Sequence, residues 1–332
     1  VGCYAKDIYT SKEEKSKLLP TSEGYIFYNN DGNYSLLSYN GLKTELVLPD
    51  AINGNTYFID NYAFYNCDRL VSVIIPNGVT SIGDCAFYNC HNLADIAIPD
   101  SIMEIGAFAF DGCDGIIIKE NGVSYVDKWI IACDSSVTEV ILRSDTIGIM
   151  ANAFADCSNL TSIIIPESVV NIGQSAFNGC SNLTSITLPF VGANRDGMGD
   201  TSFRYIFNVM PDSLKSVTIA GGANISIGAN AFQDCSNLTS VVLGENVTSI
   251  GAQAFQNCNN LTSLTLGENV TSVGAYAFQN CSGLIEIVIP DSVIRIDEYA
   301  FYGCGGLTSI EIGNGVTSIG NYAFSQCNKL MS

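Results

Sequence analysis

The sequence predicts a β-rich solenoid, a stack of short repeated units, and three observations predict it. A Phe recurs with a period of about 23 residues along most of the chain, a period typical of repeat proteins. Each such Phe follows an Ala and precedes a Cys by three positions, and each unit opens with a short β-branched run that ends at Pro or Gly. In repeat proteins a unit can bury its apolar face only against its neighbours. The periodic residues are Phe64, Phe87, Phe110, Phe154, Phe177, Phe232, Phe255, Phe278, Phe301 and Phe324.

One unit, residues 160–182 (LTSIIIPESVVNIGQSAFNGCSN), shows the expected elements. Its alternating β-branched run predicts a strand that ends at Pro166, since Pro cannot donate to a strand ladder. Val169 and Ile172 indicate a second short strand before a glycine. The Ala-Phe pair that follows predicts a helical or 3-10 turn whose ring, Phe177, fills the space between successive rungs.

Two longer intervals between phenylalanines predict altered units. Between Phe110 and Phe154 we expect a variant unit at 114–136, in which Trp129-Ile130 replace Ala-Phe. Between Phe177 and Phe232 we expect an enlarged loop at 189–213. Counting strand starts then gives 12 rungs, from Leu46 to Leu307.

The ends of the chain predict further divisions. Residues 1–23 are charged and indicate a flexible leader or tether, and 24–66 an N-terminal cap with an atypical first repeat. Within this cap, Asn30-Asp31-Gly32 between two aromatic runs is a strong hairpin signal. The solenoid is expected over 67–332; it stops at Ser332 where a new strand would begin, which suggests either a segment of a longer protein or an unusually abrupt end.

Eleven of the thirteen cysteines occupy one position of the repeat, which indicates a packing position. We expect free, buried thiols there, because parallel side-chain vectors make disulfide geometry poor. Scattered disulfides and metal binding are the alternatives, the latter disfavoured by the absence of a C-x-x-C pair. Cys3 and Cys85 lie outside this column. Val1-Gly2-Cys3 fits either a flexible leader or, weakly, the end of a lipoprotein signal whose Cys would be acylated.

The repeated motifs N-L-T-S-I-x-L/I-P/G, V-T-S-I-G and A-F-x-x-C resemble the BspA-like leucine-rich repeat family over about residues 41–332. The resemblance implies a right-handed superhelix whose first strands line the concave face. It also implies secreted or surface-attached proteins of bacteria and some mucosal protists, several with proposed adhesion to host matrix proteins or to other cells. The family brings no catalytic residues with it.

Charge and composition argue against several functions. The formal charge of −19, from 33 acidic and 14 basic residues, disfavours nucleic acid and anionic membranes as partners. We find no signal peptide or transmembrane stretch in the sequence. The single histidine, His91, has no nucleophile patterned beside it, so we expect no enzyme, no cofactor and no metal site.

Strand alternation indicates where a partner would bind. One candidate surface is the outward column of the first strands, whose apolar and small side chains could dock an extended protein surface. The other is the enlarged loop, whose aromatic and Arg residues are enriched at binding hot spots, although covering its own rung would use the same residues. The candidates are Ile74, Ile164, Thr187, Val242, Thr265, Val288 and Glu311 in the column, and Phe203, Arg204, Tyr205 and Phe207 in the loop.

We therefore predict an extracellular or cell-surface adhesion or protein-recognition module. Its expected partners are host or bacterial extracellular proteins, with glycans as a further class. The alternatives are a passive structural spacer that holds another domain away from the envelope and a carbohydrate-binding module. A carbohydrate binder would need exposed aromatic side chains, which the sequence concentrates in the enlarged loop.

Overall fold

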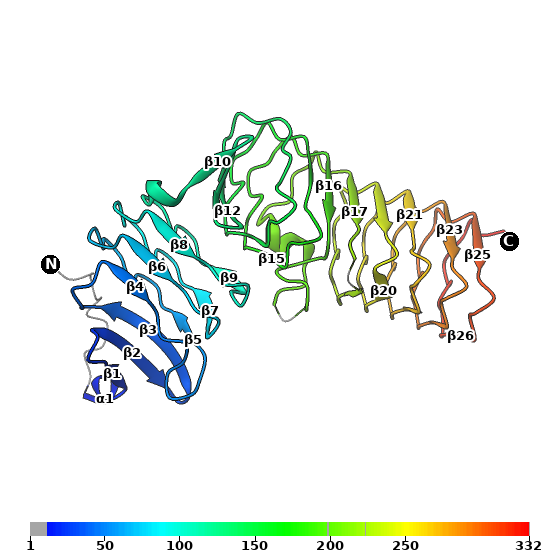
Figure 1. Ribbon diagram of the computed structural model, residues 1–332. Coiled ribbons are helices and arrows are strands. Elements are labelled where there is room, and N and C mark those ends of the chain that lie inside the picture. The colour runs from blue at the N-terminus through cyan, green and yellow to red at the C-terminus, as the bar shows by residue number, and fades with distance from the viewer. Residues whose placement is uncertain (1–11, 198, 223, 332) are drawn as a thin grey trace. The chain divides into compact units, whose positions relative to one another are not determined.

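The computed structural model describes residues 12–197, 199–222 and 224–331 (Figure 1). These residues form short strands joined by turns, with very little helix. They fall into two compact units, which we describe separately. Unit 1 is the chain to Cys133 together with Ile147–Ala153, and unit 2 is Asp134–Thr146 together with Phe154 and the rest of the chain.

Unit 1 contains the N-terminal cap and the first regular rungs. Each regular rung contributes one strand to each of two sheets, and neighbouring rungs pair in parallel. One sheet has the order β1-β2-β3-β5-β7-β9 and the other β4-β6-β8. The elements are α1 (Lys12–Ser16), β1 (Leu18–Pro20), β2 (Tyr25–Asn30), β3 (Asn33–Tyr39), β4 (Glu45–Val47), β5 (Tyr57–Ile59), β6 (Ser72–Ile74), β7 (Val79–Ile82), β8 (Asp95–Ala97) and β9 (Glu104–Ile105).

The hairpin of the cap forms where the turn signal predicts it. β2 and β3 pair antiparallel, and Asp31 and Gly32 between them both have positive φ, as a two-residue hairpin turn requires. β3 then pairs in parallel with β5 and so joins the cap to the first rung. The described part of the predicted flexible leader is folded onto the cap: it forms α1 and the strand β1, and β1 pairs antiparallel with β2. Cys3 and the proposed acylation lie outside the described residues.

The variant unit differs from the expected short repeat. It forms η1 (Asp114–Ile116), β10 (Ile118–Glu120), β11 (Val123–Val126), β12 (Trp129–Cys133) and β13 (Gly148–Ile149). β10, β11 and β12 make an antiparallel meander, so Trp129 and Ile130 are buried on a strand instead of in the turn that Ala-Phe occupies elsewhere. Two tight turns make the meander: Asn121-Gly122, with positive φ at both positions, joins β10 to β11, and Asp127, also with positive φ, lies between β11 and β12.

Unit 2 is the most regular part of the chain. Its first strands pair in parallel in the order β14-β16-β17-β19-β21, followed by the pair β23-β25. Its second strands include the sheet β18-β20-β22-β24-β26. The elements are β14 (Ser162–Ile164), β15 (Asn171–Ile172), β16 (Ser185–Leu188), η2 (Phe203–Ile206), β17 (Ser216–Ile219), β18 (Ile225–Ile227), β19 (Ser240–Leu243), β20 (Val247–Ile250), β21 (Ser263–Thr265), β22 (Ser272–Val273), β23 (Glu286–Ile289), β24 (Arg295–Ile296), β25 (Ser309–Ile312) and β26 (Ser318–Ile319).

The predicted fold class is confirmed: the chain is a leucine-rich repeat solenoid of about 12 turns. Partners in the regular rungs are one repeat period apart, as in Ser240 opposite Ser263 on β19 and β21. Residues that pair across neighbouring strands are therefore separated in the sequence by one repeat period.

The phenylalanine column is an internal stack of rings. In unit 2, Phe232, Phe255, Phe278 and Phe301 are fully buried. Successive ring centroids from Phe232 to Phe324 are 4.8 to 5.3 Å apart, with planes inclined by 7 to 18°. This spacing matches the separation of neighbouring strands, roughly 4.8 Å. Each ring therefore covers the next and fills the interior of its rung.

The cysteine column forms a second ladder, through hydrogen bonds. In seven rungs the thiol Sγ donates to a Phe carbonyl oxygen of the preceding rung, at 2.9 to 3.2 Å. Cys258, for example, donates to the carbonyl of Phe232 at 3.1 Å. The same carbonyl also accepts the backbone N–H of the Cys in its own turn, as Phe232 does from Cys235 at 3.1 Å, so the thiol is a second donor that links two rungs at a buried acceptor. Free thiols are found at every described column position except Cys67, which is disulfide-bonded, so for that residue the prediction is wrong. The free thiols are buried as predicted except Cys133 and Cys327, which are half-buried.

We expect Cys258→Ala to lower the free energy of unfolding by about 1 kcal/mol, because it removes the thiol's hydrogen bond to the Phe232 carbonyl, which keeps only the N–H of Cys235 as donor, and opens a small void. Urea unfolding followed by circular dichroism measures this loss. Cys85→Ala, at a half-buried position outside the column, is the control and should cost less than about 0.5 kcal/mol. Equal losses in the two variants would contradict a structural role for the ladder.

The buried thiols also predict a loss of stability at alkaline pH. Burial raises the pKa of Cys180 and Cys281 to about 12 and that of Cys235 to about 11. The folded state therefore keeps protons that an unfolded thiol releases near pH 8.5. This contribution is complete below that pH and is lost as the pH rises toward 12.

At pH 10 each such thiol should reduce stability by about 2 kcal/mol relative to pH 8. Thermal unfolding at the two pH values tests this. Cys281→Ala should lower the melting temperature at pH 8 and should narrow the difference between pH 8 and pH 10. A difference that does not change in this variant would show that other groups cause it.

Candidate recognition surface

Strand alternation places one row of side chains on the outside of the first strands of unit 2. On β16, Ile186 and Leu188 are buried, while Thr187 between them points outward. The in-register pairing of β14, β16, β17, β19 and β21, and of β23 with β25, aligns the equivalent residues. We call this row the outer strip. It consists of Ile141, Ile164, Thr187, Thr218, Val242, Thr265, Val288 and Glu311.

Six of the seven predicted column residues lie on the outer strip. The seventh, Ile74, is the equivalent residue of β6 in unit 1, where its side chain is 49% exposed. Among the predicted apolar residues of unit 2, Ile164 and Val288 are the most exposed, at 69% and 57%. Single exposed apolar side chains are common on protein surfaces, but several that lie together are unusual and mark interaction sites.

One end of the strip is apolar. The rung before β14 has no regular first strand, but an isolated bridge between Glu139 and Ser162 sets Ile141 beside Ile164. These two side chains are 80% and 69% exposed. They flank a shallow hollow of about 480 Å³ that Leu142 and Pro166 also line. The sequence-based column omitted Ile141, although the alignment of VTEVIL on LTSIII would have included it.

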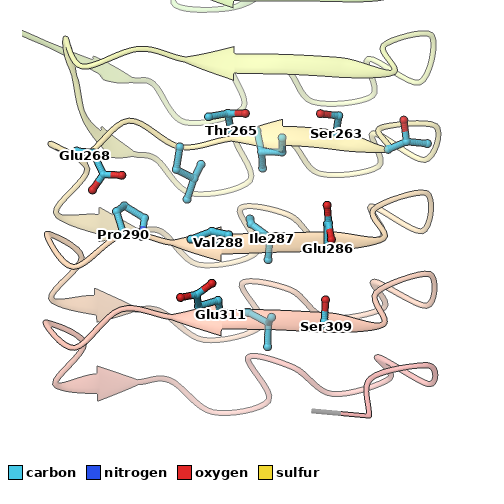
Figure 2. Close-up of a pocket in the computed structure, with 13 residues that line it drawn as sticks. Ser263, Thr265, Glu268, Glu286, Ile287, Val288, Pro290, Ser309 and Glu311 are labelled. Carbon is cyan, nitrogen blue, oxygen red and sulfur yellow. The ribbon is translucent and has the colours of Figure 1, made fainter.

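The other end of the strip is acidic. A hollow of about 590 Å³ lies over β21, β23 and β25. Figure 2 shows its side chains, with Glu286 beside Ser309 and Val288 beside Glu311 on neighbouring strands, in the register of the pairing. Glu268 lies in the turn after β21 and also lines the hollow.

These three carboxylates have no cationic neighbour in the hollow. None of the thirteen lining residues is basic, and Glu268, Glu286 and Glu311 take part in no ion pair within the described residues. All three are exposed. The hollow therefore presents uncompensated negative charge around the exposed side chain of Val288.

The enlarged loop is packed against its own rung. Phe203 and Phe207 are fully buried, and they continue the ring stack across the enlarged unit. Phe207 contacts Phe177 at 5.9 Å between centroids, and Phe203 contacts Phe232 at 4.9 Å. The structure thus places two of the four candidate loop residues in the core, where they cannot meet a partner.

The other two loop candidates lie nearer the surface. The Arg204 guanidinium donates from Nη2 to the carbonyl oxygen of Asp234 at 2.7 Å, which ties η2 to the following rung. Tyr205 is half-buried, and its carbonyl accepts from the backbone N–H of Ser175. The loop therefore acts first as a cover for its rung.

A tyrosine stack is a surface feature that the sequence-based interpretation did not consider. Tyr276, Tyr299 and Tyr322 stack at 4.9 and 5.1 Å between centroids. Each has φ between 56 and 59°, a region that bulky residues rarely adopt. The sequence signal was present, as a Tyr just before Ala-Phe in three successive units. The rings cover one another within the stack, and Tyr322 at its end is 63% exposed.

Other kinds of site receive little support. The described residues contain no group of three or more His, Cys, Asp or Glu side chains placed to hold a metal ion. Nδ1 of His91 lies 2.9 Å from Oδ1 of Asp68 in an exposed pair. In the described part of the chain, no helix is both long enough and apolar enough to cross a membrane.

The fold and this surface define a leucine-rich repeat protein. The model of the BspA type leucine rich repeat region matches residues 57–184, 126–211 and 201–331, so the chain belongs to the BspA-type leucine-rich repeat family. The resemblance seen in the repeat motifs is thereby confirmed. The fold of this family is typically non-catalytic.

Two solved structures are similar to the chain. The chain is 28% identical to a leucine rich cell surface protein from Faecalibacterium prausnitzii, covering 95% of this chain and 93% of that one, with a TM-score of 0.37. It is 24% identical to a leucine-rich repeat protein from Bacteroides ovatus, covering 95% and 92%, with a TM-score of 0.32. No curated protein matches the chain.

We expect Arg204→Ala to lower the free energy of unfolding by about 1 kcal/mol, because it removes a charge-assisted hydrogen bond at a partly exposed position. Chemical unfolding measures the loss. Lys215→Ala, whose ammonium donates to the Asp212 carbonyl three residues away, is the control and should cost less, since its bond does not join two rungs. A fully stable Arg204→Ala variant would contradict the covering role of the loop.

Proposed function

We propose that the chain is a cell-surface protein-recognition module, with adhesion to host or bacterial extracellular proteins as its role, and that the outer strip of unit 2 is its binding surface. The observation that carries this proposal is the gathering of exposed apolar side chains in a row that no other described segment covers. Membership of the BspA-type family supports a cell-surface location.

The geometry of the strip suits an extended protein surface. Eight outward positions follow one another at the strand spacing, roughly 4.8 Å, and none of them carries a basic or aromatic side chain. Contact with the strip would bury Ile141, Ile164 and Val288, each more than half exposed in the structure. At about 25 cal/mol per Å², burial of such side chains is a favourable contribution to association.

The two alternatives receive less support. A carbohydrate site of the usual kind stacks sugar rings on exposed aromatic faces, whereas the loop rings Phe203 and Phe207 are buried. A passive spacer needs the same core but no exposed apolar row. Isolated exposed isoleucines would fit a spacer, but paired ones on adjacent rungs fit recognition better.

We expect the double variant Ile141→Ser/Ile164→Ser to lose binding to any protein that the module captures. The immobilised chain is screened at physiological salt against extracellular matrix proteins, mucins and a glycan panel, and each hit is repeated with the variant. Both side chains point to solvent, so the variant should unfold at nearly the same temperature as the parent.

The matched control is Ile294→Ser/Ile319→Ser, which removes two isoleucines that are 55% and 50% exposed at the second strands of the same unit. Binding that survives in the strip variant and fails in this control would place the site elsewhere. Silence of the folded parent across the whole panel would favour the spacer.

A further inference from the structure

The two ends of the outer strip differ in chemistry, and this difference specifies the kind of segment that fits it. We propose that the strip binds an extended polypeptide that carries a cluster of Lys or Arg side chains at the hollow over β21, β23 and β25, and an apolar side chain at Ile141 and Ile164. This inference rests on the proposed function and names the class of its partner.

The acidic end selects for cations. Glu268, Glu286 and Glu311 surround the hollow without a basic neighbour, so their oxygens are free to accept charge-assisted hydrogen bonds from ammonium or guanidinium groups. Glu286 and Glu311 lie on adjacent paired strands, so one ligand segment can reach both. The net charge of −19 adds a long-range attraction for cationic segments.

The hollow is also adapted to the stem of a basic side chain. Val288, 57% exposed, lies between the carboxylates, and Leu264 and Ile287 form part of the lining. Lys and Arg place their methylene stems on apolar surface while their charged ends remain at the polar rim. An acidic rim around an apolar centre therefore complements the whole side chain.

The apolar end argues for a polypeptide instead of a simple polyamine. Ile141 and Ile164 are the most exposed large apolar residues of the strip, and a polyamine would gain nothing from them. Seven strand intervals separate Ile141 from Glu311, or roughly 34 Å at about 4.8 Å each. An extended chain covers this distance in about 10 residues. The spacer itself has to cross only from Ile164 to the edge of the hollow at Thr265, four strand intervals or roughly 19 Å, so the fitting segment separates its apolar residue from its basic cluster by about 6 residues.

A set of labelled peptides tests this inference with the full chain. The first peptide carries Leu-Ile, a Ser/Thr spacer of about 6 residues, which is the extended length from Ile164 to the edge of the acidic hollow, and three lysines. The others replace Lys by Gln or by Glu, or halve the spacer. Binding is followed by fluorescence anisotropy at low and physiological salt. Spermine is titrated in parallel as a competitor.

We expect Glu268→Gln/Glu286→Gln/Glu311→Gln to weaken the Lys peptide about tenfold, since each exposed pair contributes up to about 1 kcal/mol. Affinity should fall with salt, the Glu peptide should not bind, and the short-spacer peptide should bind several-fold more weakly. The control Glu104→Gln/Glu120→Gln/Glu298→Gln makes the same charge change at three exposed sites outside the strip and should change affinity less than twofold.

Each remaining outcome is decisive. Equal weakening by the two triple variants would mean non-specific attraction and would overturn the proposal, as would spermine binding as tightly as the Lys peptide. Binding of the Gln peptide that equals that of the Lys peptide, and that is lost in Ile141→Ser/Ile164→Ser, would overturn the cationic class and leave the proposed recognition function standing. If no peptide binds the folded chain but the protein panel gives a strip-dependent hit, the cationic inference alone fails; if the panel is also silent, both fail.

Discussion

In-register pairing between rungs is the constraint on which the rest of this protein depends. Backbone bonds join equivalent positions of successive rungs, as when the N–H of Phe255 donates to the carbonyl of Ala277 at 2.7 Å. Once this offset is set at one repeat period, every side chain of one rung lies over its equivalent in the next. A slip by one residue would exchange the inward and outward faces of every strand.

That register explains why identical residues recur in columns. Each repeated side chain makes its contact with the equivalent position of a neighbouring rung. Rings stack on rings, thiols donate to the Phe carbonyl of the preceding rung, and Thr hydroxyls donate to the rung before, as Thr262 does to Thr239. Selection at one position is therefore coupled to the positions above and below. The outward side chains do not take part in these core contacts between rungs, and their residue types accordingly vary along the outer strip among Ile, Thr, Val and Glu.

The sequence predicted the regular part of the fold well for this reason. The phenylalanine and cysteine columns were visible because packing repeats with the chain. The meander around Trp129 was not expected, although Asn121-Gly122 signalled its turn, because the alignment imposed the repeat on a segment with different local preferences. The surface was predicted only in part. Glu311 was placed outward, but the hollow that it lines with Glu286 and the absence of basic residues from that lining are three-dimensional properties. Composition also could not distinguish the buried aromatics of the loop from exposed ones.

The enlarged unit shows which structural requirement an insertion into this solenoid has to meet. Phe203 and Phe207 supply the rings that carry the stack from Phe177 to Phe232. The inserted residues thus fill the interval in the ring stack that the insertion itself creates. A foreign loop grafted into another rung would have to do the same. Insertion tolerance in such chains is then a matter of aromatic content more than of length, and natural variants with long loops should be recognisable by paired aromatic residues inside them.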